Sequence, residues 1–353
     1  MKAVVYHGRD DIRVEDVPAP EPGPGEMLVR VDACGICPTD LKKIQKGLLP
    51  GPRIFGHEIA GTVAALGRGT TRWREGQRVV VHHHVPCGAC FYCNRSAYAQ
   101  CAHYKKNGTT AGFEPSGGGY AEYVRVFDWI VERGVVAVPD HVRSDEASFV
   151  EPVNTCLKAV EKAAIIPGEM VLVVGQGPIG LLLMQLARWI GATVVATDPL
   201  VERRARSVEL GASFVLDSAA DVAGEVRALT EGRGADCALI AAGGEAAFTQ
   251  AIAATRPAGR LVSFAATSPG ETAEVDLGVL TTSEKDLLTA YSSSIDLQEQ
   301  AAQLVFTRQL RVREIVSHRL PIERAAEAFA LAMRPGPQTL KIVLQMTGEG
   351  APR

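Results

Sequence analysis

Four cysteines stand close together in one short stretch of the chain, VPCGACFYCNRSAYAQC: Cys87, Cys90, Cys93 and Cys101. Four thiolates bind Zn²⁺ tetrahedrally at about 2.3 Å, and such a closed site leaves no position for water, so it supports structure rather than catalysis. These spacings therefore predict a structural zinc lobe over residues 85–103. A reduced or disulfide-bonded loop and an iron–sulfur cluster are the alternatives.

A second set of potential metal ligands lies in the stretches ICPTD, GHEIAGTV and FVEPVNTC, which carry Cys37, His57, Glu58 and Glu151. A thiolate, an imidazole and a carboxylate suit zinc, and a catalytic zinc takes three protein ligands and leaves one position open. Each residue alone is equally consistent with a turn cysteine or a surface acid. Cys34 also forms a C-x-x-C pair with Cys37, but no thioredoxin-like unit surrounds the pair, which argues against redox chemistry.

Three consecutive histidines, His82, His83 and His84, precede the cysteine lobe. Neighbouring side chains point in different directions, so three in a row chelate one metal poorly. We expect them to be structural, with one of them a candidate for lining an active cleft.

A glycine-rich turn follows the apolar run MVLVV and opens a helical pattern. The three glycines of the pattern G-x-G-x-x-G are Gly175, Gly177 and Gly180, and Pro178 and Ile179 stand between the last two. An acid, Asp198, ends the next apolar run, TVVATD. Together these features predict a dinucleotide-binding turn, where free N–H groups at a helix N-terminus receive the phosphates. A glycine turn that binds no nucleotide is the alternative.

Asp198 favours NAD over NADP. Its carboxylate can accept hydrogen bonds from the ribose hydroxyls, whereas it would repel a 2′-phosphate by roughly a few kcal/mol at an effective dielectric constant of about 20. Arg203 and Arg204 follow closely and would offset part of that repulsion. NADP therefore stays the alternative.

The organisation of the sequence changes near residue 152. Before it, short apolar stretches separated by glycine and proline predict a β-rich domain. After it, six apolar runs, most of them separated by amphipathic helical patterns, predict an α/β domain with a doubly wound parallel sheet. Beyond residue 293 two helical patterns precede a final strand, LKIVLQM. A length of 353 residues also favours two domains.

Composition narrows the possible partners. The chain is 46% hydrophobic and 22% charged, with a formal net charge of −3, so neither nucleic acid nor a membrane surface is expected as a partner. No stretch has the length of a signal peptide core or of a membrane span. We expect a cytoplasmic protein, in which thiols stay reduced and serve metal binding or catalysis.

Taken together, the chain resembles the zinc-dependent medium-chain dehydrogenase/reductase family over essentially its whole length. The matching pieces are CGICPTD, GHEIAGTV, the four-cysteine lobe, GGGYAEYVRV and VVGQGPIG. Glutamate and proline in EPVNT resemble the sorbitol, polyol and threonine dehydrogenase branch. The resemblance implies a GroES-like catalytic domain over 1–152 and 293–353, with an NAD-binding Rossmann domain over 153–292 inserted between them.

The resemblance also implies roles for particular residues. Cys37, His57 and Glu58 would hold a catalytic zinc, with Glu151 as a further ligand, directly or through water; which glutamate binds directly stays open. Thr39 would hydrogen-bond the substrate oxygen and pass its proton outward.

Two further implications of the resemblance concern the nicotinamide and the proton path. Thr155, in a turn formed by VNT, would contact the nicotinamide. Many relatives carry a histidine at the outer step of the proton relay, but this chain has Lys42 there, beside Lys43. The proton would leave through water and a ribose hydroxyl, through Lys42, or through one of the three histidines.

The expected activity is the oxidation of a secondary alcohol on a polyol, sugar or cyclitol to a ketone. Zinc lowers the pKa of bound water from about 16 to about 7, and a bound alcohol should follow the same trend before its hydride moves to NAD. The alternatives are an L-threonine-type or simple secondary alcohol dehydrogenase and, more distantly, a non-catalytic zinc-stabilised nucleotide-binding protein. Because relatives associate around RLVSFAA and KDLLTAYS, we expect a homodimer or homotetramer that acts on a small-molecule alcohol.

Overall fold

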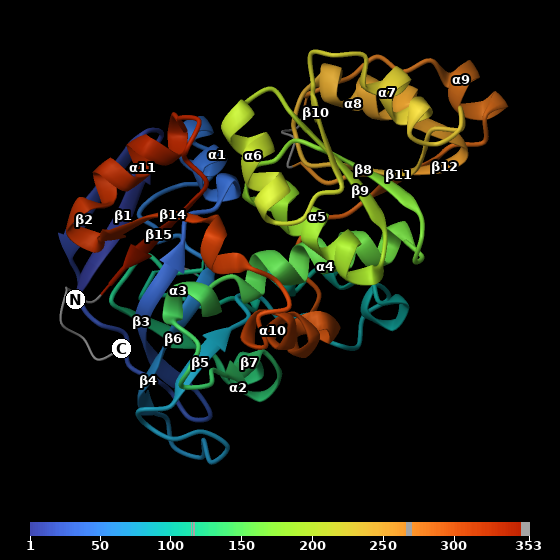
Figure 1. Ribbon diagram of the computed structural model, residues 1–353. Helices are drawn as coiled ribbons and strands as arrows, with labels where there is room; N and C mark the ends of the chain where they lie inside the picture. Colours follow the sequence, from blue (N-terminus) through green and yellow to red (C-terminus); the bar gives the residue numbers. More distant parts are fainter. Residues whose placement is uncertain (114, 116, 266–269, 347–353) are drawn as a thin grey trace. The chain divides into compact units, whose positions relative to one another are not determined.

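A computed structural model describes residues 1–113, 115, 117–265 and 270–346, and the chain separates into two units (Figure 1). Unit 1 comprises Met1–Asn154, Ser293–Arg308 and Val312–Arg353, and unit 2 comprises Thr155–Ser292 and Gln309–Arg311. The chain thus leaves unit 1 to form most of unit 2, returns to unit 1 near residue 293, and adds only the short segment Gln309–Arg311 to unit 2 after that. The described residues contain no helix long and apolar enough to cross a membrane.

Unit 1 is built mainly from strands. Its strands are β1 (Lys2–Gly8), β2 (Asp11–Asp16), β3 (Met27–Gly35), β4 (Glu58–Leu66), β5 (Arg78–Val81), β6 (Tyr123–Val126), β7 (Val135–Ala137), β14 (Val316–Pro321) and β15 (Lys341–Gln345). Its helices are α1 (Pro38–Lys46), α2 (Asp128–Arg133), α3 (Ser144–Ala147), α10 (Gln298–Phe306) and α11 (Ala325–Met333), and short 3₁₀ turns are η1 (Cys93–Arg95), η2 (Tyr98–Gln100), η3 (Tyr104–Lys106), η4 (Ile295–Leu297), η5 (Val312–Ile315) and η6 (Ile322–Arg324).

The larger sheet of unit 1 joins segments from both ends of the chain. Its strand order is β14-β15-β3-β4-β5-β7, with β6 also paired to β3, while β1 and β2 form a separate pair. In the first half of β3 buried side chains alternate with less buried ones, the period expected of a strand with one face on a core. The C-terminal strand β15 lies antiparallel to β3, so the red segment runs beside blue strands in Figure 1.

Unit 2 alternates strands and helices. Its strands are β8 (Met170–Val174), β9 (Thr193–Asp198), β10 (Phe214–Asp217), β11 (Ala235–Ile240), β12 (Thr255–Ser263) and β13 (Asp286–Thr289). Its helices are α5 (Pro178–Ile190), α6 (Val201–Glu209), α7 (Val222–Ala228), α8 (Glu245–Ala254) and α9 (Leu277–Thr282), and α4 (Val150–Ala163) leads into it. All neighbouring strands pair in parallel, in the order β10-β9-β8-β11-β12-β13.

This strand order reverses direction beside β8, which makes the carboxyl end of β8 the topological switch point of the sheet. Ligands of doubly wound sheets bind at such a point. β8 is continuously apolar and almost wholly buried because both of its faces are covered, as the uninterrupted run MVLVV predicted. The neighbouring strand β11 is also buried along its whole length, and Asp236 is its one polar residue. The Rossmann sheet and the β-rich unit agree with the predicted fold class.

One local expectation was wrong. The stretch VNT, residues 153–155, is not a turn but part of α4. Pro152 occupies the third helical position, where a missing N–H breaks no intrahelical bond, and the N–H of Val153 already donates to the carbonyl of Phe149. Pro152 therefore lies in the first turn of this helix and does not end it.

Candidate active site and metal centres

Three of the predicted metal ligands converge in unit 1. One ligand atom each from Cys37, His57 and Glu58 lies within 4.8 Å of the others. The register of two antiparallel strands explains this, because Gly35 at the end of β3 pairs with Glu58 at the start of β4. Cys37 follows β3 by two residues and His57 precedes β4 by one. Both therefore lie at the same end of this pair of central strands.

A buried carboxylate orients His57. Asp40, in the first turn of α1 and 0% exposed, lies 3.0 Å from Nδ1 of His57 through its Oδ2. The N–H of Gly56 and the hydroxyl of Tyr120 donate to the same oxygen, and Lys43 donates to Oδ1. Because Nδ1 is engaged with Asp40, Nε2 is the nitrogen left for a metal, an arrangement typical of histidine ligands.

The charges around Asp40 shift the pKa values of both partners. Burial alone would raise the pKa of the Asp40 carboxyl, but His57 and Lys43 lower it well below its ordinary value. Burial likewise opposes protonation of His57, yet Asp40 and Cys37 raise the pKa of its imidazole well above the ordinary value. Asp40 therefore stays ionised, and a metal ion must compete with a proton for His57.

Glu58 is held from one side by a lysine that lies 283 positions away in the chain. Nζ of Lys341, at the start of β15, donates to Oε1 of Glu58 at 2.5 Å and to the carbonyl of Ile36. Burial would lower the pKa of Lys341, but Glu58 and Cys37 raise it. The second oxygen, Oε2, is buried and has no hydrogen-bond partner among the described residues.

Room for that second oxygen comes from Gly35, since a Cβ at this position would collide with Oε2 of Glu58. The donor set fits zinc, because it brings together a sulfur, an imidazole nitrogen and a buried carboxylate oxygen that has no other partner among the described residues. The geometry thus supports a metal held by Cys37, His57 and Glu58.

Glu151 lies near this group but outside it. No ligand atom of Glu151 joins the set lying within 4.8 Å of one another, and its Oε1 is 3.9 Å from Nδ1 of His83. Burial, partly offset by His57, raises the pKa of Glu151 to about 7. In this structure Glu58, rather than Glu151, is the carboxylate placed with Cys37 and His57.

The remaining predicted polar residues lie on two helices, α1, which follows Cys37, and α4, which contains Glu151. Thr39 is half-buried at the start of α1, and Lys42 is half-buried on the same helix. Thr155 lies on α4, four residues after Glu151. The structure leaves their roles as predictions.

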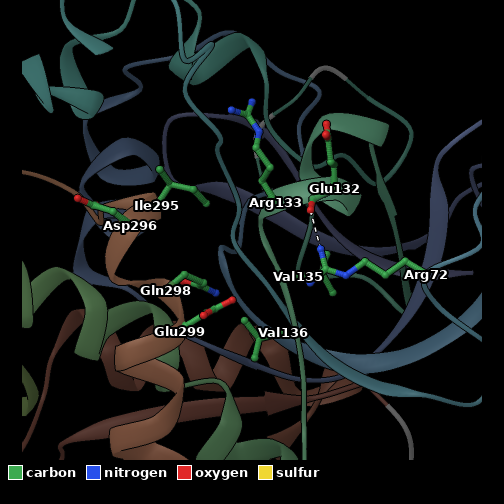
Figure 2. Close-up of a pocket in the computed structure, with 9 residues that line it drawn as sticks. All are labelled: Arg72, Glu132, Arg133, Val135, Val136, Ile295, Asp296, Gln298 and Glu299. Atoms are coloured by element: carbon green, nitrogen blue, oxygen red, sulfur yellow. Dashed lines mark hydrogen bonds between the residues drawn. The ribbon is translucent and has the colours of Figure 1, made fainter. Parts of the chain in front are cut away.

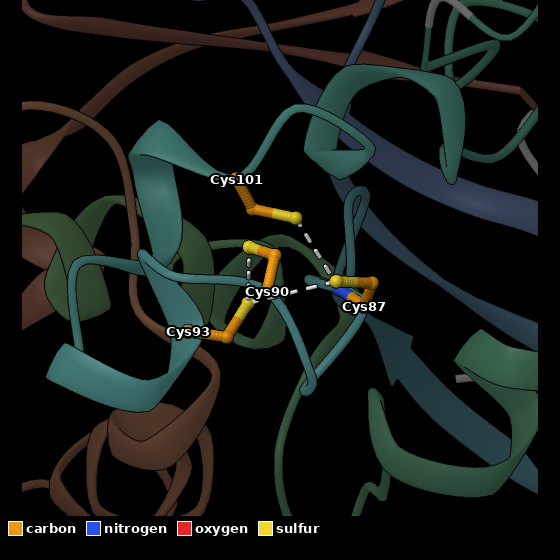
Figure 3. A group of neighbouring side chains, drawn as sticks. All are labelled: Cys87, Cys90, Cys93 and Cys101. Atoms are coloured by element: carbon orange, nitrogen blue, oxygen red, sulfur yellow. Dashed lines mark hydrogen bonds between the residues drawn. The ribbon is translucent and has the colours of Figure 1, made fainter.

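The four lobe cysteines gather around one point, and Figure 3 shows their sulfur atoms turned toward one another. Sγ of Cys93 lies 3.5 Å from that of Cys90 and 3.9 Å from that of Cys87. A zinc tetrahedron with bonds of about 2.3 Å has sulfur–sulfur edges of about 3.8 Å, so the spacing fits zinc and is far too long for a disulfide. Backbone N–H groups, first that of Ala89, lower the pKa of Cys87 to about 6 and so favour the thiolate.

The three histidines point to three different places. Nδ1 of His82 lies 2.9 Å from Oε1 of Gln298 on α10, His84 stacks on Tyr104 of the lobe at 5.2 Å, and the His83 ring lies 4.9 Å from that of His57. His83 is thus the histidine that faces the metal ligands.

Gln298 also lines a pocket of about 320 Å³ in unit 1, shown in Figure 2. The pocket mixes opposite charges, with Arg72, Arg133, Glu132, Asp296 and Glu299 around it. None of the metal ligands lines it. We therefore place the chemistry at Cys37, His57 and Glu58, called the triad below, and not in this pocket.

The glycine turn of unit 2 has the geometry of a dinucleotide cradle. Gly175 has a φ of +87°, and a Cβ on Gly180 would collide with the carbonyl of Gly175, so both positions require glycine for the fold itself. Gly177 differs, because a Cβ there would meet nothing within 4 Å. No neighbouring atom among the described residues explains that glycine, whereas a pyrophosphate approaching the N-terminus of α5 would.

Asp198 is buried at the carboxyl end of β9. Its oxygens accept from the backbone N–H groups of Gln176, at 2.7 Å, and Leu200, at 2.9 Å. Each oxygen retains a lone pair for a ribose hydroxyl. Arg203 approaches Asp198 to 3.8 Å, and its own Nε is buried without a partner in the described part of the chain.

Sequence reasoning missed three residues of the site. Asp40 was detectable in principle, since an acid three residues after a metal-binding cysteine is a plausible partner for a histidine ligand. Tyr120, in a loop before β6, and Lys341, at the start of β15, carried no signal of their own, because only contacts between segments far apart in the chain bring them to Asp40 and Glu58.

Comparison with known proteins identifies the domains in which these sites lie. The alcohol dehydrogenase GroES-like domain model matches residues 23–140, and the zinc-binding dehydrogenase model matches residues 178–307. The first range contains Cys37, His57, Glu58 and the cysteine lobe, and the second contains all of α5 and Asp198.

Relatives match along the whole chain. L-threonine 3-dehydrogenase of Pyrococcus furiosus is 33% identical over 359 residues, which cover 98% of this chain and 97% of the relative. Sorbitol dehydrogenase of Gallus gallus is 30% identical over 360 residues, covering 97% and 96%. Among solved structures, a protein from Sinorhizobium meliloti described as a zinc-binding dehydrogenase and bound to NADP superposes with a TM-score of 0.88 at 28% identity, covering 98% of both chains.

Proposed function

From the premise that this chain belongs to the zinc-dependent medium-chain dehydrogenase/reductase family, in its polyol and threonine dehydrogenase branch, we propose that it oxidises a secondary alcohol of a polyol, sugar or cyclitol to a ketone. The chain is an oxidoreductase that uses zinc and a nicotinamide dinucleotide. The single observation that carries the proposal is the convergence of Cys37, His57 and the unpaired Oε2 of Glu58.

The chain's own residues supply the environment for this reaction. Cys37, His57 and Glu58 would hold zinc, which when bound supplies Lewis acidity that makes an alcohol easier to deprotonate. Asp40 keeps the metal-facing nitrogen of His57 available. Lys341 balances the charge of Glu58, so that the donor set does not become too anionic.

Two further residues are assigned to the proton path. The hydroxyl of Thr39, two residues after Cys37, would accept the alcohol proton and hand it onward. Glu151, whose pKa is about 7, can take or release a proton near neutral pH. Thr155 would contact the nicotinamide.

NAD is the proposed hydride acceptor. The Asp198 carboxylate can still receive two ribose hydroxyls, and it would repel a 2′-phosphate. Arg203, at 3.8 Å from Asp198, offsets only part of that charge. Because the Sinorhizobium protein was solved with NADP bound, assays should test NAD and NADP separately.

A threonine-type reaction is the second candidate, favoured by the 33% identity to the Pyrococcus enzyme. Both candidates oxidise a secondary hydroxyl, and they differ in the group next to it. A substrate panel of sorbitol, inositols, aminocyclitols, threonine and butanediol separates them.

We also propose a homo-oligomer in a reducing, cytoplasmic setting. β13 is one of the two edge strands of the unit 2 sheet, and Leu287 on it and Tyr291 just after it are half-exposed. Pairing of two such edges would cover them. A reducing compartment suits the eight cysteines, because none of these described residues forms a disulfide.

The decisive test is turnover of the panel with NAD and with NADP, followed by the absorbance of the reduced cofactor. We expect activity with polyols and NAD, loss of activity on zinc removal, and recovery on adding zinc back. Cys37→Ser should abolish turnover and remove one zinc per chain. Cys237→Ala, which changes a buried cysteine of β11, should retain both the turnover and the full zinc content. Full activity in a zinc-free preparation would refute the proposal.

A further inference from the structure

His83 is the buried histidine of the HHH stretch that faces the metal ligands. Its side chain is 7% exposed, and its Nδ1 has no hydrogen-bond partner among the described residues. Two groups lie close to it on that side, the ring of His57 at 4.9 Å and Oε1 of Glu151 at 3.9 Å from Nδ1. An imidazole nitrogen buried without a partner is costly in a folded protein unless a ligand or an ordered water completes it.

His83 does not belong to the metal-binding set. Its ring nitrogens are outside the group of ligand atoms that lie within 4.8 Å of one another, as are the oxygens of Glu151. Both residues therefore border the space beside the metal rather than the metal itself. The gap of 3.9 Å between Nδ1 and Oε1 is too long for a direct hydrogen bond.

One hydroxyl group can bridge this gap. An oxygen about 2.8 Å from each atom fits between two groups 3.9 Å apart. A hydroxyl both donates and accepts, so it can donate to the carboxylate of Glu151 and accept from an Nδ1–H of His83. If His83 carries its proton on Nε2, the hydroxyl can instead donate to Nδ1.

We propose that His83 and Glu151 bind a second hydroxyl of the substrate, on the carbon next to the one that is oxidised, and that His83 thereby selects vicinal diols and polyols over simple alcohols. The inference rests on the proposed function, which places the reacting oxygen at the metal. The rings of His83 and His57 are adjacent, so a substrate atom that touches His83 is separated from the reacting oxygen by only a few bonds.

The test compares two substrates that share a carbon skeleton, butane-2,3-diol, with each stereoisomer assayed separately, and butan-2-ol. We expect the wild-type protein to prefer at least one diol isomer in kcat/KM. His83→Phe keeps a ring but removes both nitrogens, so the ratio of diol to monoalcohol kcat/KM should fall by about 10- to 100-fold. The value for butan-2-ol should change little.

Two matched variants and two binding measurements complete the design. His83→Asn, whose amide can replace Nδ1, should retain most of the ratio, and His84→Phe, whose ring faces Tyr104, should leave the ratio unchanged. Zinc content of His83→Phe should equal that of the wild type. Calorimetric binding of the diol to the protein–NADH complex should weaken in His83→Phe but not in His84→Phe.

An unchanged ratio in His83→Phe overturns the inference. So does an equal loss on both substrates together with a loss of zinc, because His83 would then be a metal ligand. If the wild-type protein oxidises no alcohol of the panel, the proposed function itself fails and this inference fails with it; activity on the panel with an unmoved ratio removes the inference alone.

Discussion

At the scale of residues, buried charges around the metal ligands compensate one another. Asp40 and Glu58 are both nearly inaccessible, and each has its own cationic partner within 3.0 Å, Lys43 for Asp40 and Lys341 for Glu58. A buried carboxylate without such a partner would lose its charge or destabilise the fold. The two lysines therefore compensate the charge of two carboxylates that solvent does not reach.

Asp40→Asn should weaken metal binding. The amide places N–H donors where Oδ2 now accepts from Gly56 and Tyr120, and it removes the negative charge beside His57. We expect zinc affinity at the triad to fall about 10- to 100-fold, measured by competition with a chelator. Lys46→Gln, at an exposed position of the same helix, is the control; equal affinities of wild type and Asp40→Asn would show that Asp40 does not orient the ligand.

Lys341→Met should make the metal-free protein less stable and more dependent on zinc. Removing one partner of a buried ion pair costs about 3–5 kcal/mol, and Glu58 would then lack its cation. Zinc can replace that charge, so adding zinc should raise the thermal midpoint more in Lys341→Met than in the wild type. Lys46→Met, at an exposed position of α1, is the control. Equal shifts on adding zinc would contradict this role.

At the scale of elements, a very short helix is tied to a distant strand by charge. Asp145 in α3 is 3% exposed and accepts from Nε of Arg143 at 3.0 Å and from Nε of Arg319 in β14 at 2.5 Å. Burial alone would raise the pKa of Asp145, but Arg143 and Arg319 lower it below its ordinary value of 3.8. A four-residue helix has little stability of its own, so this contact is important for its position.

Asp145→Asn should destabilise unit 1 in a pH-dependent way. The lowered pKa means that the carboxylate contributes stability above about pH 4 and loses it as the pH falls through the folded-state pKa. We expect a loss of about 1–3 kcal/mol at pH 7 and a smaller difference at pH 3.

The measurement uses denaturant unfolding followed by tryptophan fluorescence. A Trp189→Phe background removes the tryptophan of unit 2 and leaves Trp73 and Trp129, both in unit 1, as reporters. If the Asp145→Asn variant differs from its parent by the same amount at every pH down to 3, the carboxylate is not the cause.

At the scale of the whole molecule, unit 1 depends on both ends of the chain. β15 lies between β14 and β3 in the sheet, and it supplies Lys341. Every residue of unit 2, in contrast, lies between 155 and 311. The two sites should therefore respond differently to loss of the C-terminal segment.

A chain that ends at residue 311 should lose the triad zinc and keep dinucleotide binding. Truncation removes β14, α11 and β15, exposes an edge of β3 and leaves Glu58 without Lys341. We expect NADH binding, followed by its fluorescence, to persist while metal analysis shows loss of the triad zinc. A chain that ends at residue 346, which keeps β15 complete, is the control; retention of the triad zinc after truncation at 311 would refute the expectation.

The sequence by itself determined the kinds of chemistry. Cysteine spacing specified a zinc lobe, and G-x-G-x-x-G between an apolar run and a helical pattern specified a dinucleotide turn, because both signals depend on residues close together in the chain. The alternation of strands and helices after residue 152 likewise specified the parallel sheet, since local periodicity reflects which faces are buried.

Only the tertiary structure decided which residues cooperate. The β3–β4 register placed Cys37, His57 and Glu58 together, β15 brought Lys341 to Glu58, and folding turned His83, rather than His82 or His84, toward the metal ligands. It also made VNT a helix, because proline is tolerated in a first helical turn. The physical reason is common to these cases: contacts between residues far apart in the chain depend on strand register and side-chain direction, which local sequence patterns do not encode.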